Sequence, residues 1–338
     1  MRFPFLSLLA ALALCALAPA QTPSPTTSAG SNAGSPNAGS KISAEKQEIL
    51  WQKMVIAIER VDRNLSGVMA VGVLDLTSGR QYLLHGDEIL PQASSIKIAV
   101  LAELYHQEQQ GQQGTSGKQR LSDLYTVRSE DLVPDSDIML GLTPGVTRLT
   151  NRDLATMMVA VSDNSATNAL IERLGMENVN ATLRSLGLHD TLLRRKMMDI
   201  KAAQQGRDNV STPREMMTLL AEIYRHKLFD KALTDDFFKV LSFGSSSGNA
   251  KDSKFVPVIP EGVVIADKPG ELEAVRTDSG IIFTANRPFV LSVMTAYLRD
   301  EHEGDKAIGE VARAAFEYFD VIGRASDYGR VISPRSSR

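Results

Sequence analysis

The core of the protein is expected to form around the stretch Pro91-Gln92-Ala93-Ser94-Ser95-Ile96-Lys97-Ile98-Ala99-Val100-Leu101-Ala102. Over Ile96–Leu104 almost every residue is apolar, and Lys97 and Glu103 are the only charges. A helix that is apolar on all sides is a buried helix. Ser94 stands where this helix is expected to begin, at a usual cap position for serine. The stretch therefore predicts a buried helix that carries a serine and, one turn later on the same face, a lysine.

A serine at a helix N-terminus, close to a lysine in apolar surroundings, has the parts of an activated nucleophile. Desolvation favours the neutral amine, which can accept the serine proton, and the helix amides can hold an oxyanion. The S-x-x-K pattern alone is weak, because about one occurrence is expected by chance in a chain of this length. Ser43-Ala44-Glu45-Lys46 is such an occurrence and indicates only the start of a solvated helix. A buried lysine can also simply extend to water.

The composition is that of an ordinary globular protein. The 338 residues carry a net charge of −3, and 43% of them are hydrophobic, which suits one large domain or two small ones. No basic excess indicates a nucleic-acid partner. The five histidines are scattered without an H-x-x-x-H pair, so we expect no metal and no cofactor.

The N-terminus has the pattern of a secretory signal peptide. Arg2 precedes the apolar run Phe3–Ala18, and Ala18-Pro19-Ala20 is a small-x-small cleavage site. We therefore expect residues 1–20 to be removed near Ala20, leaving a periplasmic or secreted protein without a membrane span. The only cysteine, Cys15, lies in this segment, and the Leu14 before it fits a lipid anchor poorly. The mature chain is thus expected to have no disulfide.

Both ends of the mature chain read as polar extensions around one domain. Residues 21–42 are rich in Ser, Gly, Pro and Thr and indicate a flexible linker, and 323–338 indicate a polar tail. The domain is then 43–322.

Hydrophobic periodicity and turn signals give an order of elements within this domain. Helices are predicted over 45–60, 152–161, 165–174, 177–186, 212–226, 235–241 and 306–319, and strands over 67–76, 81–84, 263–266, 274–284 and 289–297. Loops are predicted over 107–119, 192–210 and 244–254. Strands and a helix at both ends, with helices between them, predict an α+β fold in which both ends build one antiparallel sheet. We expect an α/β lobe (43–90 and 245–322), an inserted helical lobe (91–244) and a cleft between them.

Two further motifs follow Ser94-Ser95-Ile96-Lys97 along the chain, namely Ser162-Asp163-Asn164 and Lys268-Pro269-Gly270. S-x-x-K, S-D-N and K-T-G in this order are the mark of class A β-lactamases and penicillin-binding proteins. The chain resembles that superfamily over about Ile42–Phe319. The run Ser162–Asn168 is similar to the family's S-D-N-T-A-x-N turn. The resemblance implies a serine β-lactamase-like fold and a β-lactam or peptidoglycan-like peptide as substrate.

The resemblance also implies roles for single residues. Ser94 would be the acylated nucleophile, and Lys97 its proton partner. Ser162 would pass a proton to the departing nitrogen, and Lys268 would face the substrate carboxylate. Without the other motifs, a helix cap would explain Ser162 equally well. Lys268 by itself would be an ordinary solvated lysine at the end of a strand.

The substrate is expected to meet three further residues from the same motifs. Asn164 would bond a substrate amide, and the backbone amides of Ser94 and Glu271, beside Gly270, would form the oxyanion hole. Asp163 is expected to tie its turn together.

Two more residues are assigned by position alone. Arg276 resembles an arginine that helps to bind the carboxylate, although a pair with Asp278 explains it nearly as well. Asp199 is expected to be structural and near the site, where the family usually has asparagine.

Three positions depart from the family pattern. Pro269 replaces a hydroxyl residue that usually contacts the substrate carboxylate, and Asp135 stands where many members carry an aromatic gatekeeper. Most seriously, no glutamate occurs between Asp190 and Val210, the region of the omega loop. Counting back from Arg207-Asp208 puts Arg195 where a class A enzyme has the glutamate that activates the deacylating water, and a basic residue is a poor general base.

These observations leave three hypotheses. The first is a secreted serine hydrolase that opens β-lactams or related amides and esters. The second is a penicillin-binding or DD-peptidase-like protein or sensor that is acylated but clears the adduct slowly. The third is a non-catalytic module that binds cell-wall peptides, which the intact set of four candidate catalytic residues disfavours. We expect the hydrolase, acting as a monomer.

Overall fold

The computed structural model describes residues 43–246 and 252–331. The predicted signal peptide and linker lie outside these residues, as does the tail from 332 onward. The described part of that tail forms a short turn closed by a bridge between Ala325 and Val331. No helix within the described ranges is long and apolar enough to cross a membrane.

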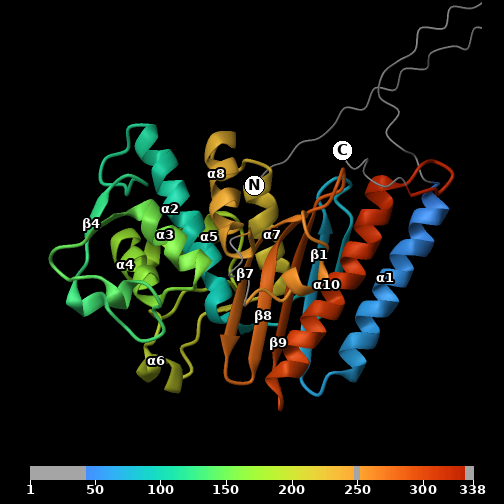
Figure 1. Ribbon diagram of the computed structural model, residues 1–338, viewed down its shortest axis with the longest axis horizontal. Coiled ribbons are helices and arrows are strands. Elements are labelled where there is room, and N and C mark those ends of the chain that lie inside the picture. The colour runs from blue at the N-terminus through green and yellow to red at the C-terminus, as the bar shows by residue number, and fades with distance from the viewer. Residues whose placement is uncertain (1–42, 247–251, 332–338) are drawn as a thin grey trace, which may run out of the picture. The chain divides into compact units, whose positions relative to one another are not determined.

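The centre of the fold is a five-stranded antiparallel sheet in the order β2-β1-β9-β8-β7 (Figure 1). Its strands are β1 (Val68–Asp75), β2 (Gln81–Leu84), β7 (Val264–Leu272), β8 (Val275–Phe283) and β9 (Phe289–Ala296). The two ends of the domain meet where β1 pairs with β9, with Val71 opposite Val293. The predicted α+β fold, with one sheet built from both ends, is therefore confirmed.

Helices surround this sheet and fill the long segment between β2 and β7. They are α1 (Ala44–Asn64), α2 (Lys97–Gln112), α3 (Asn151–Ala160), α4 (Asn164–Leu174), α5 (Met176–Ser185), α6 (Ile200–Gln204), α7 (Pro213–Tyr224), α8 (Lys231–Leu241), α9 (Phe243–Ser246) and α10 (Glu301–Arg324). Short 3₁₀ helices occur at η1 (Ala93–Ile96), η2 (Ser129–Asp131), η3 (Met139–Gly141) and η4 (Val256–Val258). Two small ladders join β3 (Leu90–Pro91) to β6 (Val210–Ser211), and β4 (Leu124–Thr126) to β5 (Arg148–Thr150).

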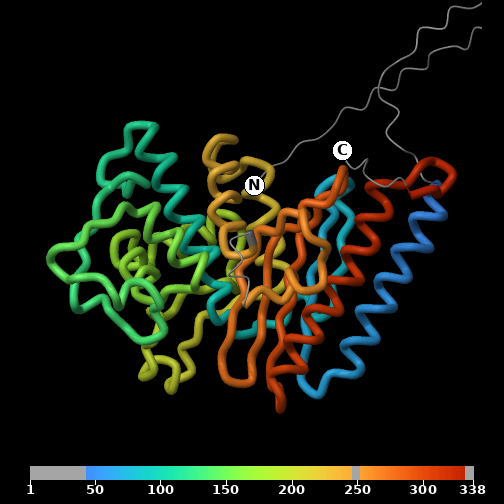
Figure 2. The backbone as a smooth tube through the Cα atoms, viewed as in Figure 1, coloured from blue at the N-terminus to red at the C-terminus, as the bar shows by residue number. Residues whose placement is uncertain are grey.

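The sheet separates two hydrophobic cores. Along β1, Ala70 and Leu74 belong to a core shared with α2 and the helical lobe, whereas Met69, Val71 and Val73 belong to a core shared with α1 and α10. Successive side chains of a strand point to opposite faces, so one strand serves both cores. In the backbone view α1 and α10 run side by side on one side of the sheet, with the helical lobe beyond the other (Figure 2).

The helix predicted around Lys97 is α2, which is buried over most of its length. Its residues Ile98, Val100 and Leu101 are fully buried, as the apolar pattern predicts. Its start differs from the prediction, because Ser94 lies inside η1 and no side chain caps α2. The helix also continues to Gln112, into the predicted loop, since the Gln107 side chain is buried and donates to Glu103 and to the Leu174 carbonyl.

Several other boundaries differ for local reasons. Strand β7 runs through Pro269 to Leu272 instead of stopping at Ala266; it is an edge strand, where proline is tolerated because one row of N–H groups has no partner. Helix α8 begins at Lys231, because the Asp230 side chain caps it. The predicted loop 192–210 contains α6, which Asp199 caps.

Candidate active site

The segment that carries Ser94 is bound to the sheet through side chains outside the three motifs. The Ser95 hydroxyl donates to the Lys268 carbonyl at 2.7 Å and lies 2.7 Å from the Thr277 hydroxyl. Thr277 donates in turn to the Gln92 carbonyl at 3.1 Å. These contacts fix η1 against β7 and β8, with Ala93 held at a positive φ of 47° just before Ser94. Neither Ser95 nor Thr277 is a defining residue of one of the three motifs, so no local pattern in the sequence indicates these bonds.

Gly270 allows this close approach. A Cβ atom at Gly270 would lie 2.9 Å from the Ser94 amide nitrogen, 2.7 Å from the Gln92 carbonyl oxygen and 2.5 Å from the Thr277 hydroxyl. Real Cβ atoms essentially never show such contacts, and two of the three neighbours are backbone. Glycine is therefore required at this position, and β7 passes directly beside the backbone of Ser94.

The Lys97 side chain reaches the second motif. Its Nζ lies 2.6 Å from the Ser162 carbonyl oxygen, 2.9 Å from the Ser162 hydroxyl and 2.9 Å from the Asn164 side-chain oxygen. The side chain is fully buried, so it does not extend to water. Burial lowers the pKa of Lys97 well below its ordinary value, and the charge of Lys268 lowers it further, against Asp163, Asp135 and Asp252.

Ser162-Asp163-Asn164 forms the break between α3 and α4. Ser162 has a φ of 56°, a left-handed conformation that is uncommon outside glycine, and it does not cap α4. The Asp163 carboxylate caps α4 through the Ala166 amide and also accepts the amides of Ile138 and Met139. Asp163 thus ties the turn to the segment that precedes it, and the Ser162 side chain remains directed to Lys97.

Lys268 is almost fully buried on β7, and its Nζ donates to the Pro269 carbonyl at 3.1 Å. Burial lowers its pKa, while the charges of Asp252, Asp278 and Asp267 oppose this. Asp267 and Asp278 are themselves fully buried on β7 and β8. The pKa of each is raised chiefly by burial, and that of Asp278 further by the charge of Asp267. Ser245 and Ser253 donate to Asp267, and the Lys254 amide donates to Asp278.

Two adjoining cavities open beside Ser94. The larger has a volume of about 310 Å³ and is lined by Ser94, Asp135, Asp137, Val161, Ser162, Asn164, Asp252, Lys268, Pro269 and Glu271. The smaller, of about 130 Å³, is lined by Ala93, Ser94, Asp135, Asn164, Arg195, Met197, Met198, Asn209, Glu271 and Leu272. All four candidate catalytic residues therefore meet here: Ser94, Ser162 and Lys268 line the larger cavity, and Lys97 bonds to Ser162.

The loop 192–210 forms the floor of the smaller cavity. Arg195 is nearly buried, and its guanidinium donates to Asp208 at 3.1 Å. Met197 is held by both backbone groups, since its amide donates to the Asn168 side chain and its carbonyl accepts from it. Asp199 does not line either cavity and is used to cap α6. The side of Ser94 that faces this loop thus meets a guanidinium and two thioethers.

Arg276 is the predicted substrate-binding residue whose side chain the structure pairs elsewhere, and it lines neither cavity. Its guanidinium bonds to Glu301, lies 3.3 Å from Asp305 and donates to the carbonyls of Leu272 and Val275. The alternative pair with Asp278 does not form either. The partners come from α10, which the sequence could not place against β8.

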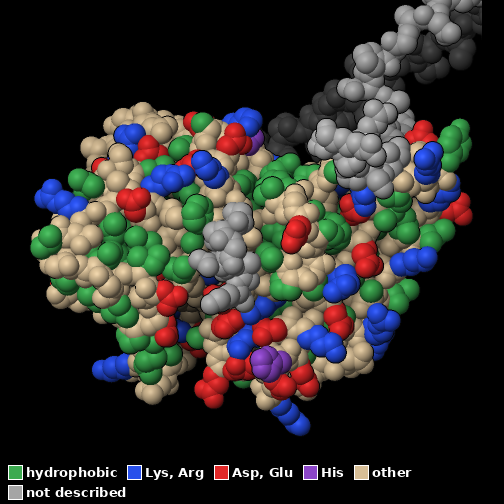
Figure 3. All heavy atoms as spheres, viewed as in Figure 1, with side chains coloured by type: hydrophobic (Ala, Val, Ile, Leu, Met, Phe, Trp, Pro, Cys, Tyr) green, Lys and Arg blue, Asp and Glu red, His purple; other side chains and the backbone are tan. Residues whose placement is uncertain are grey.

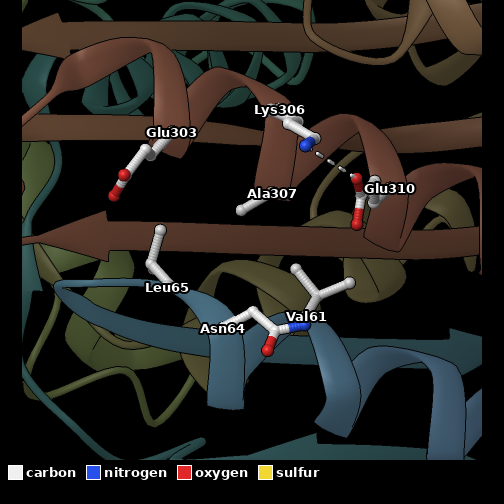
Figure 4. Close-up of a pocket in the computed structure, with 7 residues that line it drawn as sticks. All are labelled: Val61, Asn64, Leu65, Glu303, Lys306, Ala307 and Glu310. Atoms are coloured by element: carbon white, nitrogen blue, oxygen red, sulfur yellow. Dashed lines mark ion pairs between the residues drawn. The ribbon is translucent and has the colours of Figure 1, made fainter.

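A further hollow lies far from this chemistry, between α1 and α10. Figure 4 shows it lined by Val61, Asn64, Leu65, Glu303, Lys306, Ala307 and Glu310. Lys306 pairs with Glu310 across one helical turn at 3.8 Å. No serine, cysteine or histidine lines it, so it offers no nucleophile. Within the described ranges, no group of three or more His, Cys, Asp or Glu residues could hold a metal ion.

Comparisons with known proteins agree with this geometry. The model of the β-lactamase enzyme family matches residues 53–319. The β-lactamase SME-1 of Serratia marcescens is 27% identical over 278 residues, covering 78% of this chain and 88% of its own. A β-lactamase of Streptomyces albus G is 27% identical over 326 residues, covering 94% and 96%.

Solved structures give the same likeness. A β-lactamase from Sphaerobacter thermophilus has a TM-score of 0.69 and 27% identity, and the match covers 79% of this chain and 97% of that one. The structure of PBP-A has a TM-score of 0.70 at 22% identity and covers 80% and 96%, which is a likeness of fold.

Proposed function

Because the chain belongs to the β-lactamase enzyme family and is a serine hydrolase of the class A β-lactamase type, we propose that β-lactams acylate Ser94 rapidly and that the acyl-enzyme is hydrolysed slowly. The observation that carries this proposal is the contrast between the two sides of Ser94. One side has the buried Lys97 amine bonded to Ser162. The other has Arg195, Met197 and Met198, with no carboxylate from the loop 192–210 among the described residues that line the cavity.

The acylation step uses the groups on the first side. The neutral Lys97 amine accepts the Ser94 proton as Oγ bonds to the lactam carbonyl carbon. The carbonyl oxygen becomes an oxyanion, held by the backbone amides of Ser94 and Glu271. The ring C–N bond then breaks, and the nitrogen receives the proton from Lys97 through the Ser162 hydroxyl. The proton count balances without a cofactor.

Substrate binding is assigned to the residues that line the larger cavity. Lys268 faces the substrate carboxylate, and Asn164 bonds the side-chain amide. Pro269 supplies no N–H and no hydroxyl here, so the carboxylate has one partner fewer than in the family pattern. Arg276 is not included, because its guanidinium bonds to Glu301 and Asp305.

Release of the product requires a base that activates water against the ester. The carboxylates of the loop are engaged elsewhere, because Asp208 pairs with Arg195 and Asp199 caps α6. Outside the loop, Asp135 and Glu271 also line the smaller cavity. We assign deacylation to Lys97, the base of the acylation step, and it then serves both steps. A penicillin-binding protein and a slow β-lactamase both follow this scheme and differ only in the rate of deacylation.

A time course with a chromogenic cephalosporin, followed by absorbance and by intact mass together, tests the proposal. We expect a burst of about one equivalent, an adduct on Ser94, and a slow steady state after it. Sustained turnover without an adduct would contradict slow deacylation and assign Lys97 to both steps at full rate. Neither a burst nor an adduct would overturn acylation by β-lactams.

The site of action is proposed to be outside the cytoplasm. Residues 1–20 have the pattern of a cleaved signal peptide, and residues 21–42 the composition of a linker. N-terminal sequencing of the exported protein should begin at Gln21. The substrate would then be a β-lactam or a peptidoglycan-like peptide, bound by a monomer.

A further inference from the structure

Acidic side chains surround the mouth of the larger cavity. Asp135, Asp137, Asp252 and Glu271 are exposed and line it, whereas the lysine that lines it, Lys268, is buried at its base. In the space-filling view, acidic side chains gather where the helical lobe meets one end of the sheet (Figure 3). We call Asp135, Asp137, Asp252 and Glu271 the acidic rim.

Three members of the acidic rim lack a cation of their own. Glu271 pairs with Lys254 at 2.5 Å. No ion pair joins Asp135, Asp137 or Asp252 to another side chain within the described residues, although each borders the cavity. A substrate in the cavity therefore meets three carboxylates that form no ion pair with a described residue, besides the single ammonium of Lys268.

Asp135 has a backbone conformation that its surroundings hold in place. It has a φ of 54°, and its carbonyl accepts the Asn164 amide at 3.4 Å. The next residue, Ser136, accepts the Ser165 amide at 2.9 Å and donates to the Val133 carbonyl. Non-glycine residues rarely adopt this conformation unless the surroundings impose it, and such positions cluster at functional sites.

The field of the acidic rim reaches the reacting groups. Asp135 lines both cavities next to Ser94 and Asn164. Burial lowers the pKa of Lys97, and the charges of Asp135 and Asp252 are among those that oppose it. The same charges must act on any ionised group of a substrate that fills the cavity.

We propose that the acidic rim selects β-lactams whose acyl side chain carries a cation, while Lys268 takes the carboxylate of the lactam nucleus. The inference rests on the proposed acylation of Ser94. The selected substrate is thus a zwitterion that aligns its negative end with the base of the cavity and its positive end with the mouth. A second anion on the side chain is disfavoured, because it faces the carboxylates of the acidic rim.

Three penicillins that differ only at the side-chain α-carbon test this. Ampicillin carries an ammonium there, benzylpenicillin a hydrogen and carbenicillin a carboxylate. The second-order rate constant for acylation of Ser94 is measured by intact mass, at a pH where the amine is protonated and the carboxylates are ionised. We expect ampicillin to exceed carbenicillin by about tenfold or more at low salt, with benzylpenicillin between them. The ratio should shrink in about 1 M salt.

Matched charge variants locate the effect. Asp135→Asn keeps the shape, and asparagine tolerates a positive φ. It should reduce the ratio of ampicillin to carbenicillin about threefold. Glu317→Gln, on the exposed face of α10 beyond the opposite side of the sheet, changes the net charge equally and should leave the ratio as it is.

The outcomes separate this inference from the proposed function. If all three penicillins acylate Ser94 at equal rates, the selection by charge is wrong and the proposed acylation stands. A ratio that Glu317→Gln and Asp135→Asn reduce equally reflects net charge and also overturns the assignment to the acidic rim. If none of the three labels Ser94, both proposals are wrong.

Discussion

The two sides of Ser94 differ in what they can do to a proton. On one side Lys97, Ser162 and Asn164 form a connected set in which a buried amine lies within 3 Å of a hydroxyl. On the other side the loop 192–210 offers a guanidinium and two thioethers. The first side can accept a proton and return it, whereas the loop 192–210 brings no base to the second side that could activate water. The two halves of a serine hydrolase reaction thus have separate structural requirements.

The loop lacks its base but keeps its supports. The Asn209 side chain accepts the amides of Arg194 and Arg195, and the Asn168 side chain holds Met197 through two bonds. Glu215 accepts the amides of His189, Asp190 and Thr191. A loop held this firmly is not one that has lost its structure. Its defect is confined to the side chains that face the ester.

The largest effect is expected from the nucleophile. Ser94→Ala removes the hydroxyl that is proposed to form the acyl bond, so covalent labelling by benzylpenicillin should vanish and turnover should fall by a factor of about 10⁴ or more. Intact mass measures the labelling, and the fold is checked by an unchanged melting temperature. Ser95→Ala is the control: it should weaken the attachment of η1 to β7, yet still be labelled. Undiminished labelling of Ser94→Ala would show that another residue is acylated, and the contrast between the two sides of Ser94 would lose its meaning.

The next effect is expected on the other side, from Met197→Glu. The backbone of Met197 is fixed by Asn168 and its side chain lines the smaller cavity with Ser94, so a carboxylate there can face the ester and its attacking water. General-base catalysis contributes about 10² to 10⁴ in rate. Deacylation, followed as the decay of the adduct by mass, should accelerate about 100-fold or more with acylation unchanged.

Two further variants control for the shape and the position of that carboxylate. Met197→Gln has the same shape without the base and should deacylate as slowly as the wild type. Arg195→Glu, which simple counting along the sequence favours, should not accelerate deacylation; it sets two carboxylates together at Asp208 and removes an ion pair. A faster Arg195→Glu variant would restore the register counted from Arg207-Asp208.

A third and smaller effect concerns the pH dependence of acylation. Only the neutral amine of Lys97 accepts the Ser94 proton, so the acylation rate should fall on the acid side as Lys97 becomes protonated. The positive charge of Lys268 helps to lower the pKa of Lys97. Lys268→Gln removes that repulsion, so the pKa of Lys97 should rise and the fall should begin at a higher pH, by about one unit.

Stopped-flow acylation at saturating penicillin, over pH 5 to 9, measures this midpoint separately from the loss of affinity. Lys306→Gln removes a positive charge from α10, away from the Ser94 cavity, and should leave the midpoint where it is. An unshifted midpoint in Lys268→Gln would mean that the charge of Lys268 does not lower the pKa of Lys97.

The sequence predicted the parts that depend on local pattern. The amphipathic helices, the hairpin β1–β2 and the three motifs were identified because periodicity, turn residues and spacing are local properties. The convergence of Ser94, Ser162 and Lys268 came from the family resemblance, since residues 68 and 106 positions apart have no local relation. That convergence agrees with the cavity they line.

The parts that were missed depend on contacts between distant segments. Thr277 holds the Gln92 carbonyl 185 residues away, and Asn168 holds Met197 29 residues away. Arg276 pairs with α10 instead of facing the cavity. A single sequence does not indicate which distant polar side chains will pair, because tertiary packing determines their partners.

The expected cap at Ser94 and the early end of β7 have related causes. A serine before an apolar helix usually caps it, but here tertiary bonds of Ser95 and Gln92 set the backbone in a 3₁₀ turn first. Proline usually ends a strand, but Pro269 lies on the edge strand β7, which has a neighbouring strand on one side only, so proline is tolerated there. In both cases the tertiary position overrode a sound local rule.

The smallest effect is expected on the pH dependence of stability, from the two acids Asp267 and Asp278 that are buried beside Lys268. The pKa of Asp278 is raised well above its ordinary value, first by burial and then by the charge of Asp267. The folded protein therefore binds this proton more tightly than the unfolded chain, so the stabilisation is complete below about pH 4 and is lost as pH rises through the folded pKa. Asp278→Asn keeps a neutral group at all pH values and should flatten that loss by about 1.4 kcal/mol for each unit of raised pKa.

Urea unfolding at intervals from pH 4 to pH 9 measures this slope, and the exposed Glu317→Gln variant should retain that of the wild type. An equal slope in wild type and Asp278→Asn would mean that the two acids are ionised together beside Lys268. Their two negative charges would then favour the protonated form of Lys268. Acylation would in that case depend on the charges of β7 and β8 as well as on Lys97.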